Sequence, residues 1–184
     1  MTEQESQVLR DNRHAYANTT CRISKMRLLL AICYMDGTLL EQSYENAFKW
    51  MDKASIGLLD AALIAGVMYE VGLGVTQDLD KALDTYNRAS AYKFVNYAVY
   101  RFYDDGTVVA KDQALARRLL TDIQPADELE KLLNTCYRRT FACARRIRNL
   151  TSHNAPQILL DTEWRMFKND LVQLLDALCC KYYE

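Results

Sequence analysis

The chain has 184 residues, half of them apolar and 26% charged, and its formal net charge is −1. These values predict one globular domain that is long enough to bury a continuous core. Six glycines and two prolines are too few for the many turns of an all-β protein, so we predict an all-α fold.

The start of the chain predicts a soluble, cytoplasmic protein. It reads MTEQESQVLRDNRH, which is polar and partly acidic and lacks the basic and then apolar order of a secretory signal. The longest apolar stretches, RLLLAICYM and LLDAALIAGVMY, are too short to span a membrane. The six cysteines have no spacing typical of a disulfide framework, so we expect reduced thiols. Residues 1–25 are expected to form an N-terminal helical capping segment.

A period of about 34 residues runs through the middle of the chain. Tyr34, Tyr69 and Tyr103 are 35 and 34 residues apart, and the residues after each tyrosine recur in one order. A glycine follows, then a polar residue suited to begin a helix, and then an alanine. These residues are Gly37, Gly72 and Gly106; Ser43, Asp78 and Asp112; and Ala47, Ala82 and Ala116. Three copies in one register predict a repeat protein.

Each copy is expected to contain two helices. The glycine ends the first helix, because glycine takes the left-handed C′ conformation without steric cost. The serine or aspartate is a good N-cap for the second helix. A single such hairpin cannot bury its apolar face, so the copies must stack on one another.

The middle copy resembles a known family. Its pattern is similar to the Sel1-like repeat, a relative of the tetratricopeptide repeat, and departs from it at Ala65, where the family has leucine. The matching residues are Ala61, Gly66, Tyr69, Gly72, Gly74, Val75, Asp78, Lys81, Ala82, Tyr86 and Ala89. The resemblance implies a right-handed solenoid of helical hairpins over residues 26–125, with repeats at about 26–60, 61–94 and 95–125.

Two further helices are expected after the repeats. The first spans about residues 126–150 and carries acids at its start and arginines near its end, as the helix dipole favours. The second spans about residues 156–182 and has one broad apolar face. We expect residues 126–184 to form a helical pair that caps the solenoid.

The glycine pair in GVMYEVGLGVTQDLDKALDTY raises the question of a phosphate-binding loop. Such a loop follows a strand, whereas the residues before Gly72 predict a helix. The segment also lacks the third glycine of a dinucleotide-binding motif and the G-K-[ST] of a P-loop. We therefore interpret it as the turn between two repeat helices, with Lys81 on the second.

The remaining reactive side chains do not form a recognisable catalytic or metal-binding pattern. The two histidines, His14 and His153, are far apart in the sequence. The vicinal pair Cys179-Cys180 suits a redox or metal role, but it has no C-x-x-C spacing and no histidine partner nearby. We predict that the protein is not an enzyme and has no cofactor, no metal site and no small-molecule substrate.

The tetratricopeptide-like resemblance implies a concave face formed by the first helix of each repeat. Mapped onto this sequence, the face is Lys25, Leu28, Ile32 and Met35; Asp60, Leu63, Val67 and Glu70; and Phe94, Tyr97, Arg101 and Asp104. A face that is both concave and apolar indicates an interaction site. Two occupants remain open: a helix or extended segment of a partner protein, or the chain's own leading segment or its helix at residues 164–178.

Residues 131–150 contain one lysine, no acidic residue and five arginines, which are Arg138, Arg139, Arg145, Arg146 and Arg148. This side of the helix suits the phosphates of RNA or an acidic partner. A net charge near zero favours the plainer interpretation, a solvated helix face.

These features together predict a non-catalytic adaptor that binds a segment of another protein in the concave groove. The resemblance implies roles in bacterial signalling, toxin neutralisation, or secreted effectors that act in the host cytosol. The alternative is a nucleic-acid-associated protein that uses the arginine-rich helix at residues 131–150.

Overall fold

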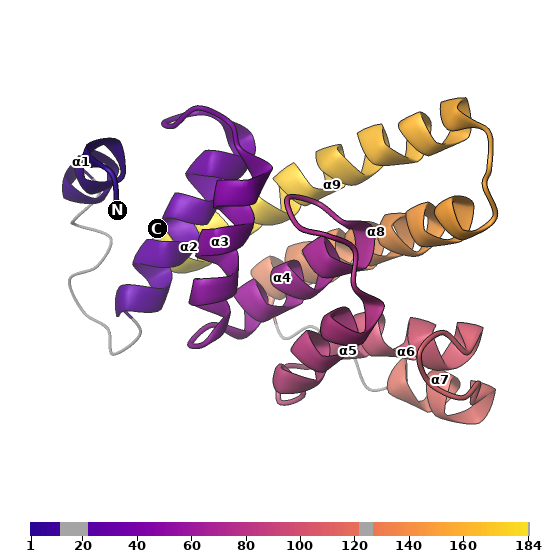
Figure 1. The fold of residues 1–184 in the computed structure, drawn as a ribbon. Coiled ribbons are helices and arrows are strands. Elements are labelled where there is room, and N and C mark those ends of the chain that lie inside the picture. Colours follow the sequence, from indigo (N-terminus) through magenta and orange to yellow (C-terminus); the bar gives the residue numbers. More distant parts are fainter. Residues whose placement is uncertain (12–21, 122–126, 184) are drawn as a thin grey trace.

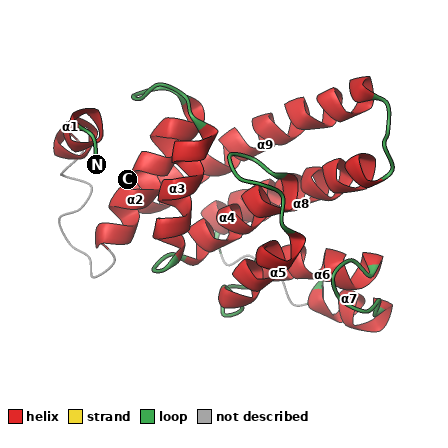
Figure 2. Cartoon of the chain, viewed as in Figure 1, coloured by secondary structure: helices red, strands yellow, loops and turns green. Residues whose placement is uncertain are grey.

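The computed structural model describes residues 1–11, 22–121 and 127–183, and in this part of the chain helices joined by loops are present and no strand is (Figures 1 and 2). The all-α prediction is therefore confirmed. The helices are α1 (Glu3–Asp11), α2 (Arg22–Asp36), α3 (Tyr44–Ser55), α4 (Leu59–Val71), α5 (Leu79–Arg88), α6 (Val95–Asp105), α7 (Gln113–Leu119), α8 (Glu128–Ser152) and α9 (Gln157–Tyr183).

Three helix pairs follow one another along the chain, with α2 packed on α3, α4 on α5 and α6 on α7. Within each pair, the first helix ends at a glycine with a left-handed backbone, and φ is between 73° and 76° at these glycines. The second helix begins with the predicted side-chain cap: Ser43, Asp78 or Asp112 accepts a hydrogen bond from the backbone N–H three residues later. The predicted boundaries between the repeat helices are confirmed by this geometry.

Two further glycines of the middle repeat allow close packing. The ring of Tyr86 lies directly over Gly66, so that any larger residue there would overlap the ring. Gly74 lies against the carbonyl oxygen of Tyr44, the first residue of α3, and also has a left-handed backbone. A side chain at Gly74 would therefore separate the turn after α4 from the start of α3.

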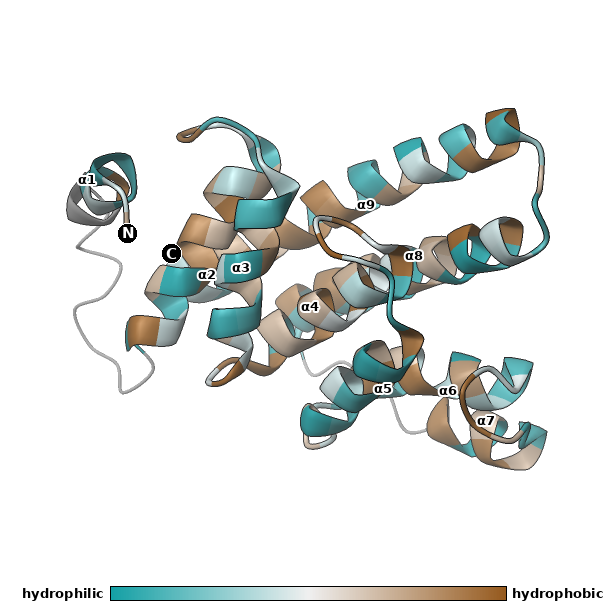
Figure 3. Cartoon of the chain, in the orientation of Figure 1, coloured by the Kyte–Doolittle hydropathy of each residue, from teal (hydrophilic) through white to brown (hydrophobic). Residues whose placement is uncertain are grey.

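Helix α4 lies at the centre of the molecule. It packs against α3, α5 and α8, and most of its residues are buried. This position explains its almost continuous apolar sequence, because a helix surrounded by protein has no face in water. Figure 3 shows the contrast between the mostly brown α4 and the more polar outer helices α3 and α5.

Helix α1 docks on the first repeat through a buried carboxylate. Glu5 is 3% exposed and accepts hydrogen bonds from the Tyr34 hydroxyl at 2.9 Å and from Trp50 Nε1 at 2.8 Å. Burial raises the pKa of Glu5, but the hydrogen bonds from the Thr2 amide, Trp50 and Tyr34 outweigh it, so that the pKa lies below its usual range. The expected capping segment at residues 1–25 contains α1 and the start of α2, and its residues 12–21 lie outside the described part of the chain.

The last two helices form a long antiparallel hairpin (Figure 1). They occupy the two regions predicted to be helical after the repeats. The hairpin does not simply continue the end of the array: α8 packs along α4 and α6, and α9 packs on α8 and reaches α2.

Candidate functional site

Most of the predicted concave face is buried. Among its apolar members, Leu28, Leu63 and Phe94 are 0% exposed, and Ile32, Met35 and Val67 are at most 4% exposed. The charged members Asp60, Glu70 and Arg101 are at most 1% exposed. Only Lys25, Tyr97 and Asp104 remain partly accessible.

The buried part of this face is covered by the chain's own helices, and chiefly by α8. Tyr137 and Phe141 of α8 are 0% and 1% exposed. The Tyr137 ring lies 5.2 Å from that of Phe94, and the Phe141 ring lies 5.8 Å from that of Tyr86, measured between centroids. The sequence left the occupant open and named the leading segment or the helix at residues 164–178 as the internal candidates. In the structure α8, with aromatic residues one turn apart, lies against α4 and α6, whereas α9 reaches α2.

A buried ionic cluster joins α8 to the face at Glu70. The Glu70 carboxylate accepts two hydrogen bonds from Arg101, at 3.0 and 2.7 Å, one from Arg148 at 2.9 Å, and one from the Tyr86 hydroxyl at 2.9 Å. Arg101 also donates to the backbone carbonyl of Phe141, at 2.6 Å. Burial lowers the pKa of Arg101, but the Glu70 charge outweighs it and the pKa is raised. Arg101 therefore stays charged and links α4, α6 and α8.

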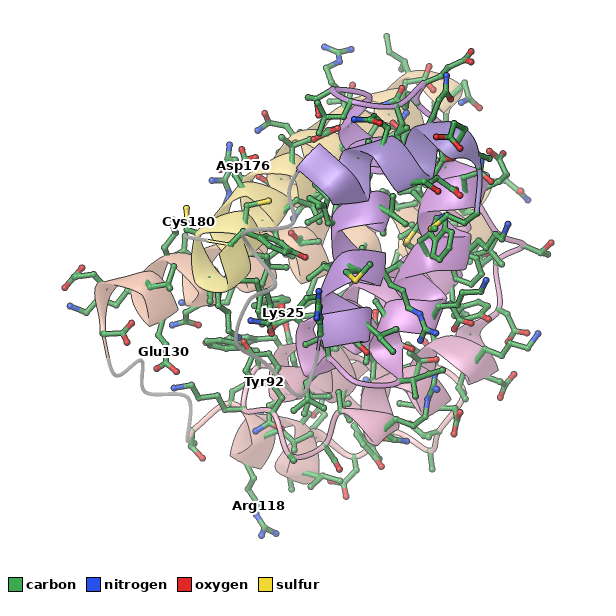
Figure 4. All side chains as sticks on the ribbon, turned by 90° about the vertical axis from the view of Figure 1, so that its left-hand side faces the viewer. Lys25, Tyr92, Arg118, Glu130, Asp176 and Cys180 are labelled. Carbon is green, nitrogen blue, oxygen red and sulfur yellow. The ribbon has the colours of Figure 1, made fainter. Side chains whose placement is uncertain are left out.

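Asp60, near the N-terminal end of α4, binds the C-terminal end of α9. Its carboxylate accepts hydrogen bonds from the Tyr137 hydroxyl at 2.5 Å, Lys181 Nζ at 2.7 Å and the Tyr182 hydroxyl at 2.5 Å. Lys181 also donates to the Tyr92 hydroxyl at 3.2 Å. Figure 4 views this end of the molecule, with Tyr92 and Lys25 labelled beside the C-terminal part of α9. The two acids of α4 thus hold the hairpin at two separated points.

Four of the five arginines in the predicted anion-binding patch face carboxylates of the same chain. Arg139 pairs with Asp170 at 2.5 Å and Arg146 with Glu163 at 2.8 Å. Arg145 pairs with both Asp104 and Asp105, and Arg148 with both Glu70 and Asp105. Arg138 is exposed and forms no ion pair with any residue that the structure describes; its guanidinium lies over the Tyr97 ring, 5.8 Å from the centroid.

Tyr97, one of the three accessible residues of the face, lines a hollow between α6 and α8. We call it the α6/α8 hollow; it has a volume of 610 Å³, and Arg101 and Phe141 lie in its lining. Burial raises the pKa of Tyr97, so its hydroxyl stays protonated at neutral pH. The more accessible lining residues are Tyr97, Tyr100, Leu120, Asn134, Thr135, Arg138, Arg139 and Ala142. Residues of the predicted groove and of the predicted arginine patch thus meet in one place.

Sequence reasoning missed the pairing between the two acids of α4 and the C-terminal helices. The available signal was the presence of Asp60 and Glu70 on an otherwise apolar helix. They lie ten residues apart, about 80° from each other around the helix axis, and so share one broad helical side. A buried acid needs a partner, but the sequence does not show that the partners are Arg148 and Lys181, which are 78 and 121 residues away.

The remaining candidate residues lie apart from the α6/α8 hollow. His153 lies at the end of α8, and Cys180 is exposed near the end of α9 (Figure 4). Across residues 1–11, 22–121 and 127–183, no three histidine, cysteine or acidic side chains are grouped as a metal site would require. The five cysteines within these ranges form no disulfide, while His14 and Cys21 lie outside them. No helix in the described segments is long and apolar enough to cross a bilayer.

Comparison with known proteins agrees with the repeat geometry. The Sel1 repeat family model matches residues 25–56, 59–91 and 95–121, which contain the three helix pairs. The crystal structure of a Sel1 repeat protein from Oxalobacter formigenes is similar, with 27% sequence identity and a TM-score of 0.53 over 70% of this chain and 95% of that one. No match was found among curated proteins. Since the three matched segments make up half of its length, the chain belongs to the Sel1 repeat family.

Proposed function

We propose that the protein is a non-catalytic adaptor that binds a segment of another protein at the α6/α8 hollow. Sel1 repeats generally mediate protein–protein interaction. The observation that carries this proposal is that α8 covers most of the predicted concave face but leaves Tyr97 accessible at the hollow. The partner site is thus the open margin of the groove rather than its whole length.

The packing of α8 indicates that the hairpin of α8 and α9 stays on the repeats and is not displaced when a partner binds. Displacement would return the apolar residues of α2, α4 and α6 to water, at about 1.5–3 kcal/mol for each fully buried large side chain. It would also separate Arg148 from Glu70, where both side chains are at most 4% exposed. A displacing partner would have to replace all of these contacts, so a partner is expected to bind beside α8 and not in its place.

The nucleic-acid alternative has less support. RNA binding by an arginine-rich helix requires several guanidinium groups to contact phosphates at once. Arg139, Arg145, Arg146 and Arg148 already face carboxylates of the same chain. A single exposed arginine without an ion pair, Arg138, is too little positive charge for that purpose.

The proposal is tested by partner capture from native lysate with the full chain and two matched variants. Tyr97→Ala removes a partly buried ring from the hollow, whereas Tyr44→Ala removes a partly buried ring at the start of α3. The expected result is that Tyr97→Ala loses a partner that Tyr44→Ala retains, with both variants folded by circular dichroism. The proposal is wrong if every captured partner survives Tyr97→Ala.

A further inference from the structure

We infer that the segment bound at the α6/α8 hollow is acidic, and that Arg138 and the neighbouring Arg139 recognise its carboxylates. This inference rests on the proposed function, because it names the chemistry of the partner at the same site. Three kinds of observation support it: the charge of the hollow, the state of its arginines, and the other groups in its lining.

The described lining of the hollow carries positive charge on the side formed by α8. Among the residues that the structure describes, it includes Arg101, Arg138 and Arg139 and no aspartate or glutamate. The charge of Arg101 is already met by Glu70, since both side chains are 0% exposed and lie 2.7 Å apart. The charge that faces a ligand therefore comes chiefly from Arg138, because Arg139 pairs with Asp170 at 2.5 Å.

These two arginines differ in how far their guanidinium groups are already bound to other side chains of the chain. Arg138 is exposed, has no ion-pair partner in the described part of the chain, and is held over the ring of Tyr97 by a cation–π contact. Arg139 is half exposed and shares its guanidinium with Asp170 and Gln173 of α9. A guanidinium that is held in place but lacks a carboxylate can form a two-pronged pair with one at a reduced entropic cost. Arg138 is thus the main recognition residue and Arg139 a second positive group beside it.

The rest of the lining suits an extended peptide. Tyr97, Tyr100 and Leu120 supply apolar surface for a side chain, and Leu120 is 39% exposed. Asn134 also lines the hollow, and its Oδ1 atom is buried without a hydrogen-bond donor in the segments that the structure describes. The volume of 610 Å³ lies within the range of about 300–1,000 Å³ that ligand pockets have.

The test measures binding of fluorescein-labelled probes to the full chain by fluorescence anisotropy. The first probe is a 12-residue peptide of aspartate and glutamate with one central leucine, and the second replaces every acid by its amide. A third probe is a single-stranded oligouridine RNA. The protein variants are Arg138→Glu, Arg138→Lys and, as a control with the same charge change, Arg165→Glu, an exposed position on α9 that does not line the hollow.

The expected result is binding of the acidic peptide that is at least about tenfold tighter than binding of the amide peptide. Arg138→Glu is expected to weaken acidic-peptide binding at least about tenfold, Arg138→Lys to a smaller extent, and Arg165→Glu by less than about twofold. Both positions are exposed, so the three variants should fold, which circular dichroism verifies.

The inference is overturned if the acidic and amide peptides bind equally, or if Arg165→Glu weakens binding as much as Arg138→Glu. It is also overturned if the RNA binds more tightly than the acidic peptide and depends on Arg138. Failure of the proposed function is distinct from these outcomes: it is seen when Tyr97→Ala keeps every captured partner. Loss of a partner in Tyr97→Ala without acidic-peptide binding overturns the inference alone.

Discussion

Replacing Glu70 with glutamine removes the negative charge between Arg101 and Arg148 and leaves both guanidinium groups buried. Four hydrogen bonds end on this carboxylate, from Arg101, Arg148 and Tyr86. Glutamine keeps the shape of the side chain but offers one acceptor oxygen and places an amide N–H group against arginine N–H groups. The substitution therefore measures the effect of losing the charge, because the volume of the side chain stays the same.

The expected loss of unfolding free energy follows from the burial of the residues that contact Glu70. Arg101 and Glu70 are 0% exposed and Arg148 is 4% exposed, so solvent cannot replace the lost charge. Breaking a buried ion pair by removing one partner costs about 3–5 kcal/mol of unfolding free energy. With an m-value of about 2.5 kcal/mol per molar urea, the unfolding midpoint should fall by about 1–2 M.

The assay is urea unfolding followed by circular dichroism, with Glu163→Gln as the matched control. Glu163 pairs with Arg146, which is 45% exposed, so its loss should cost less than about 1 kcal/mol. Equal midpoint shifts in the two variants would refute the reasoning, because they would mean that the Glu70 cluster does not hold α8 on the repeats.

Three further predictions follow from local geometry. Gly74→Ala should lose at least about 1 kcal/mol more unfolding free energy than Gly37→Ala. Both glycines have left-handed backbones, but only at Gly74 would the new methyl group overlap the carbonyl oxygen of Tyr44; equal losses in urea unfolding would contradict this. The lowered pKa of Glu5 contributes stability that is present above the ordinary glutamate pKa of about 4.3 and is lost as the pH falls through the lower folded value. The wild type should therefore melt above Glu5→Gln at pH 7 and converge with it in acid, and a gap that persists at low pH would count against the Glu5 anchor. Burial raises the pKa of Cys33 to about 12, so its alkylation by iodoacetamide at pH 8, measured by mass spectrometry, should require unfolding; rapid labelling of the native protein would disprove this.

The sequence by itself determined the repeat architecture, because its signals act over a few residues. A left-handed glycine such as Gly72 ends a helix, and a side chain such as Asp78 caps the next one through the backbone three residues away. The recurrence of these signals in one register predicts stacked hairpins. The positions of the two C-terminal helices were also predictable, from their apolar periodicity and from the charges at the ends of the first.

Only the tertiary structure decided what lies on the concave face. The bonds that hold the hairpin there join residues far apart in the chain, such as Asp60 and Lys181, at a separation of 121 residues. Arg145 and Arg148 gave no sign in the sequence of the carboxylates that they meet. Whether a charged side chain faces solvent, a partner or its own chain depends on how helices pack at a distance, and no local pattern encodes this. The candidate site is consequently the small α6/α8 hollow and not the full groove that the repeats alone predict.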